Sequence, residues 1–343
     1  KWYRVAWQIY AEYLEQKGLY DFADMLSLAT KLIRESPKGT YHYQYILVDE
    51  VQDLSKSKCL MLQALLGNCK RVKLFAVGDD WQSIYRFAGS NLGILKDFEK
   101  TFGRTTYHSL IEHTYRFGQP TAMISGKFIK KNRAQSRKKV KIIKGKKTPI
   151  KIVLNHQQHS KAPPDYGVVD RYIKKLYVEY GEDFFTKRLQ VISRYNRDIY
   201  RLVKTETGRY MNAKIVENTE EGIILDWWVP AANRCVQVAY CSMHKSKGIT
   251  RDIVFVINMN EGDKGMPATR VDDPIMAMML ARPDHYPLAE ERRLFYVAIT
   301  RAKELTIIVS DYRKYSRFVR EIAKYLPGET AEEILQTKRP KYK

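Results

Sequence analysis

The sequence predicts an α/β protein with two domains. Its 343 residues are enough for two domains of ordinary size, each with its own core. Short apolar runs of strand type alternate with longer segments in which apolar residues recur at helical spacing. Such alternation favours parallel sheets covered by helices on both faces. We expect a first domain over residues 1–108, a second over residues 109–325, and a basic tail over residues 326–343.

Spacing and chain-breaking residues define the elements of the first domain. Residues 2–17 form a helix, and a second helix begins after Asp21, a suitable N-cap, and ends where Ser36-Pro37-Lys38-Gly39 breaks it. The remaining elements are an apolar strand, a helix, a second apolar strand and a helix that packs on this sheet, at residues 45–48, 55–66, 72–77 and 91–102.

In the second domain, four short apolar strands follow a helix–strand–helix segment. The helices are expected at residues 119–131 and 166–180, on either side of a strand at 150–154 and a polar loop that reaches Pro164. The strands are expected at residues 189–193, 236–240, 253–257 and 305–309. After Tyr312 the chain is predicted to be helical and then polar and basic.

The charge of the chain indicates a polyanionic partner. A net charge of +22 attracts nucleic acid or an anionic membrane surface. Twelve of the 25 residues from Lys127 to Lys151 are Lys or Arg and none is acidic. This segment is either a phosphate-contacting surface, whose affinity falls steeply with salt, or a solvated face or mobile loop.

Other partners and compartments are disfavoured. The sequence has no apolar run of the length that spans a bilayer and no secretory signal pattern, so we expect no membrane partner. The four cysteines have C-x9-C and C-x5-C spacings, which are not usual zinc or redox patterns. We interpret them as reduced, mostly buried thiols of a cytoplasmic, nucleoid-associated protein.

Two carboxylates follow the first predicted strand, in Leu47-Val48-Asp49-Glu50-Val51-Gln52-Asp53. Ligands of open α/β sheets bind beyond the carboxyl ends of the strands. Mg²⁺ usually takes one or two protein carboxylates and leaves its other positions to water and nucleotide. A second carboxylate can orient or deprotonate an attacking water. The pair alone is weak evidence, because acids after a strand often face solvent or cap a helix.

Two further strings strengthen the interpretation. One, after the second strand, is Gly78-Asp79-Asp80-Trp81-Gln82-Ser83-Ile84-Tyr85-Arg86-Phe87-Ala88-Gly89-Ser90, and the other is Glu290-Glu291-Arg292-Arg293-Leu294-Phe295-Tyr296-Val297-Ala298-Ile299-Thr300-Arg301-Ala302-Lys303. With the acidic motif they closely resemble the motor core of the UvrD/Rep group of superfamily 1 helicases, from about Phe22 to Asp311. The resemblance implies two RecA-like domains, the first incomplete at its N-terminus, and the cofactors ATP and Mg²⁺.

The resemblance also implies roles in ATP hydrolysis. Asp49 would hold Mg²⁺, Glu50 would activate the water, and Gln82 would sense the γ-phosphate and couple it to the DNA site. His113-Thr114-Tyr115-Arg116 matches the family's Asn-Tyr-Arg-Ser. Tyr115 would stack on adenine, Arg116 would reach the γ-phosphate, and Arg301 would be a second arginine finger, for which a planar guanidinium is well suited. The alternative for both arginines is a surface ion pair.

Contacts with nucleic acid are implied by two strings. Ser242-Met243-His244-Lys245-Ser246-Lys247-Gly248-Ile249 matches the family's Thr-x-His-x-x-Lys-Gly-Leu. Ser242 would contact DNA, and His244 would contact DNA or couple the domains. Lys247 and Gly248 would bind the nucleotide at the interdomain cleft. Thr250 stands where the family usually has a nucleotide-contacting Glu, so we do not transfer that role.

Two aromatic residues match family positions that stack on bases, namely Tyr85 and Phe87. Phe87 replaces the commoner Trp, and Ala88 replaces a usual Arg. The structural alternatives are that both aromatics belong to a core and that His244 is structural.

Some family features are missing. The sequence contains no G-x-x-x-x-G-K-[ST] string, whose Lys and Ser/Thr grip phosphates and Mg²⁺. Because the chain begins at Lys1 and not at Met, we expect an upstream segment to supply this loop, and residues 1–343 alone to hydrolyse little ATP. The alternative is a true loss of the loop. Only about 40 residues separate strand 189–193 from Val236, where the family often inserts a helical subdomain.

The sequence therefore predicts an ATP-dependent DNA helicase or translocase that acts on single-stranded DNA or unwinds duplex DNA, with 3′→5′ polarity implied by the family. A repair or nuclease protein is a candidate partner, and the oligomeric state is not indicated. Two alternatives stay open: an ATPase-inactive nucleic-acid-binding scaffold, and the motor subunit of a helicase–nuclease complex.

Overall fold

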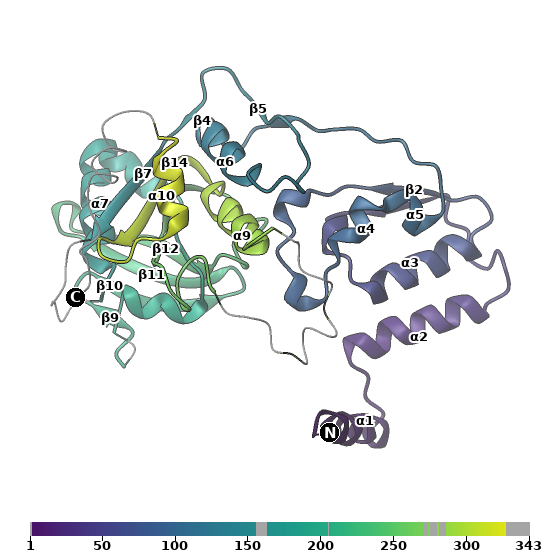
Figure 1. Ribbon diagram of the computed structural model, residues 1–343. Helices are drawn as coiled ribbons and strands as arrows, with labels where there is room; N and C mark the ends of the chain where they lie inside the picture. The colour runs from purple at the N-terminus through teal and green to yellow at the C-terminus, as the bar shows by residue number, and fades with distance from the viewer. Residues whose placement is uncertain are drawn as a thin grey trace. The chain divides into compact units, whose positions relative to one another are not determined.

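The computed structural model describes residues 2–155, 163–204, 206–269, 274, 280 and 286–326 (Figure 1). The chain divides into two compact units. The first contains residues 2–80 and 85–107. The second contains Trp81–Ile84 and the described residues from His108 to 269 and from 286 onward. Residues 327–343 of the predicted basic tail lie outside the described residues.

The first unit contains the predicted helices and strands. They are α1 (Trp2–Lys17), α2 (Phe22–Glu35), β1 (Tyr45–Val48), α3 (Lys56–Asn68), β2 (Lys73–Ala76), α4 (Leu92–Lys96) and α5 (Phe98–Phe102). Asp21 caps α2, because its carboxylate accepts hydrogen bonds from the backbone N–H groups of Ala23 and Asp24, both at 2.8 Å. β1 and β2 pair in parallel, with Tyr45 opposite Lys73. The helix expected over residues 91–102 is two short helices that meet at Asp97.

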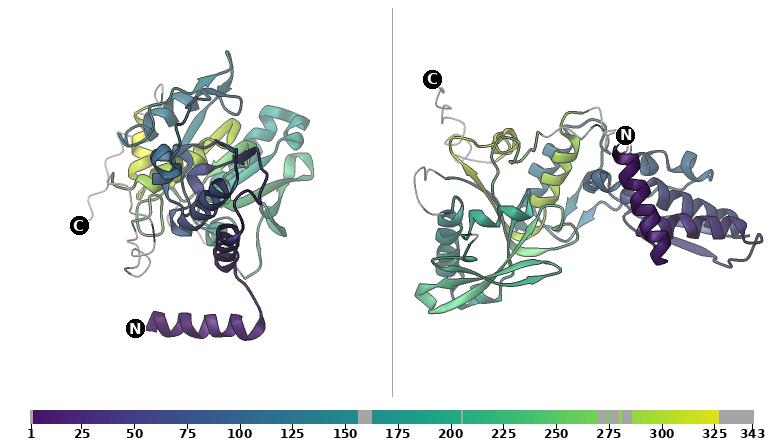
Figure 2. Two further views of the ribbon diagram at one scale, coloured as in Figure 1. Left: turned by 90° about the vertical axis from the view of Figure 1, so that its right-hand side faces the viewer. Right: turned by 90° about the horizontal axis from the view of Figure 1, so that it is seen from below.

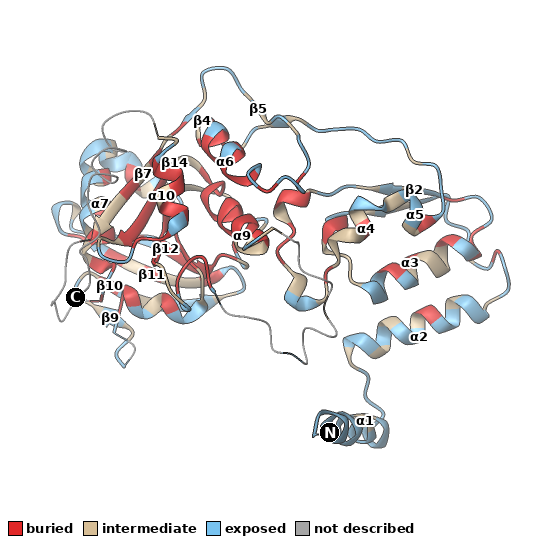
Figure 3. Cartoon of the chain, in the orientation of Figure 1, coloured by how far each residue is buried: buried red, intermediate tan, exposed pale blue. Residues whose placement is uncertain are grey.

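The sheet of the first unit is covered on one face only by the described residues. Ile46, Val48 and Leu74 pack against a core formed by α3, α4 and α5. On the other face, Leu47 is 72% exposed and Phe75 is 60% exposed. No residue of α1 is buried, as Figure 3 shows. The expectation of helices on both faces is therefore wrong for the described part of this unit.

The second unit is built on an eight-stranded mixed sheet. Its strands, in spatial order, are β7 (Ile150–Asn155), β14 (Ala302–Asp311), β13 (Arg251–Val256), β8 (Leu189–Ser193), β12 (Arg234–Ser242), β11 (Gly222–Val229), β10 (Ala213–Thr219) and β9 (Arg209–Tyr210). The pairs from β7 to β12 are parallel, and those from β12 to β9 are antiparallel.

The prediction of a purely parallel sheet is thus corrected for the second unit. Antiparallel neighbours need only a tight turn, so three strands fit between β8 and β12. Gly222 makes one of these turns possible. It has a φ of +147°, and a Cβ atom there would lie 2.2 Å from the carbonyl oxygen of Tyr240.

Helices cover both faces of this sheet. They are α6 (Thr121–Ile129), α7 (Tyr166–Tyr180), α9 (Ala289–Ile299) and α10 (Arg317–Ala323). α7 lies on one face and α9 on the other (Figures 1 and 2). α7 packs Val169 and Ile173 against strand residues such as Val238. The short parallel pairs β3 (His113–Thr114) with β5 (Lys141–Ile142) and β4 (Gln119–Pro120) with β6 (Lys147–Thr148) complete the unit.

Two findings concern compartment and redox state. Every helix in the described part of the chain is too short or too polar to cross a lipid bilayer. All four cysteines are free thiols, and three are buried, whereas Cys235 is exposed. Burial raises the pKa of the Cys241 thiol to about 12, so this thiol is not reactive at neutral pH.

Candidate functional site

The two carboxylates of the acidic motif lie at the carboxyl end of β1 in the first unit. Asp49 and Glu50 are both exposed. Glu50 has a left-handed backbone conformation with a φ of 49°, which is uncommon for a residue with a side chain. Its backbone N–H donates to Asp49 Oδ1 at 2.8 Å. The left-handed turn therefore fixes both acids at the sheet edge where ligands of α/β proteins bind.

Gln52 orients this turn, although the sequence analysis assigned it no role. Its side chain is fully buried, and its Nε2 donates to Glu50 Oε2. Its Oε1 accepts a hydrogen bond of 2.9 Å from the backbone N–H of Asp79, in the loop after β2. At Gly78 a Cβ atom would lie 2.6 Å from Gln52 Oε1. The loops after β1 and β2 are thus held together through one amide, and glycine permits the close approach.

Asp49 and Glu50 suit a hard cation that is shared with phosphate. Carboxylate oxygens are the ligands that Mg²⁺ prefers, and it commonly uses only one or two from the protein. Among the described residues no group of three or more His, Cys, Asp or Glu could hold a metal ion by itself. The donor set therefore fits Mg²⁺ that arrives with a nucleotide better than a permanently bound metal.

Trp81–Ile84 belongs to the second unit, although the residues on both sides of it belong to the first. The Trp81 ring is buried, and its Nε1 donates to the carbonyl oxygen of Ser136 at 3.1 Å. The ring also makes an edge contact with Tyr296 of α9 at a centroid distance of 5.4 Å. This tryptophan anchors the segment to the second unit.

Each of the next three residues of the segment is held by a different side chain of the second unit. Gln82 Oε1 accepts from Arg301 Nη2 at 3.3 Å. The carbonyl oxygen of Ser83 accepts from Arg293 Nε at 2.6 Å. The carbonyl of Ile84 accepts from the ring of His244. The structure thus brings together Gln82, His244 and Arg301, which the sequence analysis selected, and adds Trp81 and Arg293, which it did not.

Arg301 is fixed between α9 and β14. It is 1% exposed, and its Nε donates to the carbonyl oxygen of Val297 at 2.8 Å. Its own carbonyl accepts from the N–H of Arg251 at 3.1 Å. One edge of the guanidinium is therefore held by the α9 backbone while an Nη atom reaches Gln82.

Tyr115 and Arg116 follow β3. Tyr115 is 73% exposed, as a residue that stacks on a base must be. Arg116 Nε donates to Thr250 Oγ1 at 2.9 Å. Thr250 stands where the family has a glutamate, and in this chain its hydroxyl positions an arginine.

The segment after β12 forms a compact turn. Ser246 is fully buried, and its hydroxyl donates to the carbonyl oxygen of Met243 at 2.7 Å. Gly248 is exposed with a φ of +81°, a conformation that favours glycine. Lys247 is half-buried. Ser242 is only 8% exposed, so its side chain is less accessible to DNA than the sequence analysis assumed.

The aromatic pair Tyr85 and Phe87 lies in the first unit, around a short 3-10 turn (Arg86–Ala88). Their ring centroids are 6.1 Å apart at an interplanar angle of 63°. Phe87 is 54% exposed, and Tyr85 is half-buried. Phe87 is therefore not a core residue, and its ring presents a surface on which a base can stack.

The predicted site residues are divided between the two units. Asp49, Glu50, Tyr85 and Phe87 belong to the first, and Gln82, Tyr115, Arg116, Ser242, His244, Lys247, Gly248 and Arg301 belong to the second.

His244 is expected to stay neutral at physiological pH. Burial and the neighbouring Arg194 guanidinium lower the pKa of His244 from 6.5 to about 4, because both disfavour the charged ring. The unfolded chain takes up a proton near pH 6.5, whereas the folded chain does so only near pH 4. The contribution of this group to the free energy of unfolding is therefore complete above pH 6.5 and falls by up to about 3 kcal/mol as the pH drops to 4.

An NMR titration of the histidine ring signals measures this pKa directly. The signal that disappears in His244→Gln is the signal of His244, and we expect it to titrate near pH 4. Urea unfolding of both proteins at pH 7.5 and pH 5 tests the consequence, because the difference in stability between them should shrink at the lower pH. Titration near 6.5 would mean that the ring is solvated and does not hold Ile84.

Comparison with known proteins shows where the chain has relatives. The family model described as UvrD/REP helicase N-terminal domain matches residues 1–103, and the one described as UvrD-like helicase C-terminal domain matches residues 230–312. DNA helicase IV of Escherichia coli is 29% identical over 315 residues, which cover 91% of this chain and 40% of that protein.

Two further relatives have similar names. A protein of Mycoplasma pneumoniae named "Probable DNA helicase" is 24% identical over 348 residues, covering 98% of this chain and 57% of its own length. DNA helicase II of Haemophilus influenzae is 33% identical over 120 residues, covering 34% of this chain and 16% of its own. The chain thus spans about two fifths of the Escherichia coli protein and somewhat more than half of the Mycoplasma pneumoniae protein.

Proposed function

Because this chain belongs to the UvrD/Rep helicase family, we propose that its protein is an ATP-dependent DNA helicase that moves along single-stranded DNA and unwinds duplex DNA. The family implies two RecA-like motor domains, with limits proposed at residues 108 and 325, and 3′→5′ movement. The names of the relatives support DNA as the nucleic acid. A cytoplasmic, nucleoid-associated location and a repair or nuclease partner are part of the same proposal.

The acids of the first unit provide the hydrolytic chemistry. Mg²⁺ bound with ATP supplies positive charge that offsets the charge of the phosphates. Asp49 would hold this ion. Glu50 would take the proton of the attacking water, because its carboxylate is exposed and is oriented by the amide of Gln52. The sequence contains no phosphate-gripping G-x-x-x-x-G-K-[ST] string, so the activity is proposed for the full-length protein.

The contact between Gln82 and Arg301 is the observation that carries the proposal. An arginine finger must present its guanidinium in a fixed orientation to the γ-phosphate. Arg301 is held in this way and also contacts the glutamine that the family uses to sense the same phosphate. Arg116 would be the second finger, and Tyr115 would stack on the adenine. Lys247 and Gly248 would complete the nucleotide contacts.

DNA binding follows from the same segments. Tyr85 and Phe87 would stack on successive bases, which tolerates any sequence. Ser242 and His244 would belong to the DNA-contacting turn. Because His244 also holds the carbonyl of Ile84, a change at that turn would reach Gln82 through two residues of backbone. This short path would couple DNA binding to ATP hydrolysis.

The test is ATP hydrolysis by the full-length protein with and without a single-stranded oligonucleotide. We expect DNA to stimulate hydrolysis, and we expect displacement of a strand from a duplex with a 3′ tail but not from one with a 5′ tail. DNA binding without any hydrolysis would favour the scaffold. Hydrolysis and translocation without strand displacement, restored by a nuclease partner, would favour the helicase–nuclease subunit.

A further inference from the structure

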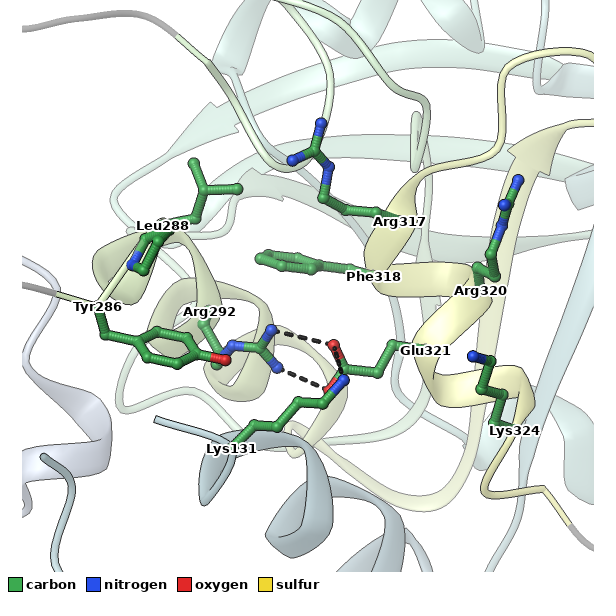
Figure 4. Close-up of a pocket in the computed structure, with 10 residues that line it drawn as sticks. Lys131, Tyr286, Leu288, Arg292, Arg317, Phe318, Arg320, Glu321 and Lys324 are labelled. Carbon is green, nitrogen blue, oxygen red and sulfur yellow. Dashed lines mark hydrogen bonds and ion pairs between the residues drawn. The ribbon is translucent and has the colours of Figure 1, made fainter. Parts of the chain in front are cut away.

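A basic pocket lies in the second unit, and none of the residues that line it is among those assigned to ATP or DNA. It has a volume of about 440 Å³ and is lined by the end of α6, by α9 and the residues that precede it, and by α10 (Figure 4). Five cations and one carboxylate line it, namely Lys131, Arg292, Arg317, Arg320, Lys324 and Glu321. We call it the α6–α10 basic pocket.

The sequence of α10 explains why cations gather there. Ser316 caps the helix, because its hydroxyl accepts from the N–H of Val319 at 3.2 Å. Phe318, Val319, Ile322 and Ala323 are buried against the rest of the unit. Arg317, Arg320 and Lys324 follow the spacing i, i+3 and i+7, so they share the opposite face of the helix. The amphipathic pattern therefore presents a stripe of positive charge.

Glu321 does not neutralise this stripe. It already accepts two hydrogen bonds from Arg292, at 2.8 and 3.0 Å, in a pair whose side chains are 7% and 9% exposed. The Arg292 guanidinium also donates to the carbonyl oxygen of Phe128 at 2.9 Å. This pair forms a rigid, electrically balanced floor. Lys131 Nζ lies 3.3 Å from the same carboxylate and adds a second cation to it.

Two cations at the rim have no acidic partner in the described part of the chain. Arg317 is paired with Glu261, whose Oε1 accepts from its Nε at 2.7 Å. No carboxylate of the described residues forms an ion pair with Arg320 or Lys324. Lys324 is exposed, and the Arg320 guanidinium lies 5.2 Å from the centre of the Tyr315 ring, which holds it in place. The pocket therefore keeps a surplus of positive charge that a ligand can use.

The surplus of positive charge continues beyond the pocket, along α6 and the residues that follow it. Lys127, Lys130, Lys131 and Arg133 are all exposed. Lys127 Nζ lies 5.7 Å from the ring centre of Tyr325, next to the end of α10. A single small anion is satisfied by two or three donors, whereas a track of charge over two helices matches a chain of regularly spaced phosphates.

We propose that the α6–α10 basic pocket binds the sugar-phosphate backbone of nucleic acid, as a contact additional to the helicase motifs. The choice of nucleic acid as the partner rests on the proposed function. The charges that line the pocket match phosphate oxygens, and phosphate contacts position the nucleic acid without selecting its sequence. Lys324 is exposed and Arg320 is half-buried, so both cations can reach phosphates, while the buried Arg292 and Glu321 are paired with each other.

The test compares two double variants of the chain. Arg320→Gln/Lys324→Gln removes the two unpaired rim charges. Arg171→Gln/Lys175→Gln is the matched control, because it removes one Arg and one Lys at the same i, i+4 spacing from the exposed side of α7 in the same unit. Binding of fluorescent single-stranded and duplex oligonucleotides is measured by anisotropy over a range of salt concentrations.

The slope of log K against log salt is negative, and we expect the rim variant to reduce its magnitude by up to about 1.8 for duplex and about 1.4 for single strands, as two lost phosphate contacts require. Its affinity at low salt should fall severalfold, while the control should match the wild type. Equal slopes for the rim variant and the wild type would overturn the proposal and leave the helicase assignment intact. If the rim variant no longer binds inorganic phosphate but has the same DNA salt slope as the wild type, the pocket is a site for a small anion instead.

The proposed function fails in a different way. If the wild type binds no oligonucleotide and DNA does not stimulate ATP hydrolysis by the full-length protein, the helicase assignment itself is wrong, and the pocket proposal falls with it.

Discussion

Glutamine in place of Glu50 is expected to slow ATP hydrolysis by the full-length protein by about 10²- to 10⁴-fold, the range that a general base contributes. The amide has the size of the carboxylate but cannot take a proton from the attacking water. Gln52 Nε2 can still donate to the amide oxygen at position 50, so the left-handed turn should keep its shape. Asp49 is unchanged, and nucleotide binding should persist.

The measurement is the steady-state rate at saturating ATP and single-stranded DNA, together with the affinity for a fluorescent nucleotide. Glu15→Gln, on the exposed helix α1 of the same unit, is the matched control and should hydrolyse ATP at the wild-type rate. A wild-type rate in Glu50→Gln would remove Glu50 from the chemistry. Loss of nucleotide binding along with the rate would show instead that Glu50 acts as a ligand of the cation.

The fold was predictable where burial gives a clear pattern. Strands β8 and β13 each contain neighbouring apolar residues that are buried on both faces of the sheet, Val191-Ile192 and residues 253–256, and the structure confirms both strands. Strands β9 to β11 were not predicted. β10 carries polar residues at exposed positions, so its sequence resembles that of a loop. Its partner β11 is largely apolar and carried a strand signal that was missed. Pairing between strands depends on tight turns, which the pattern of apolar residues before Val236 does not reveal.

The candidate site was predictable only as a set of residue types. The strings that resemble the helicase motifs identified Gln82 and two of the side chains that hold its segment, His244 and Arg301. Arg293 was missed because it binds a backbone carbonyl, an acceptor that every residue offers and that no residue type reveals. A signal was present, since two adjacent arginines that directly precede an apolar run within a helix must be paired if they are buried. In α9, Arg292 and Arg293 are 5% and 4% exposed.

Methionine in place of Arg301 is expected to reduce ATP hydrolysis by the full-length protein by about 10³-fold or more, the amount that arginine fingers contribute. Methionine keeps an apolar stem in a buried place but removes the charge and all donors. Lysine distinguishes the role of the positive charge from that of the planar donors. Its ammonium keeps the charge but cannot donate in one plane to Val297 and Gln82. We therefore expect Arg301→Lys to be intermediate.

The kinetic pattern distinguishes a finger from a structural arginine. A loss in kcat with little change in KM indicates an interaction made in the transition state. Arg171→Met, at an exposed position of α7, is the matched control, and thermal unfolding shows whether Arg301→Met still folds. If Gln82 and Arg301 act through their shared contact, the losses in Gln82→Ala and Arg301→Met will not add in the double variant. Additive losses would mean that the two residues reach the phosphate independently, and full activity in Arg301→Met would leave Arg116 as the remaining candidate finger.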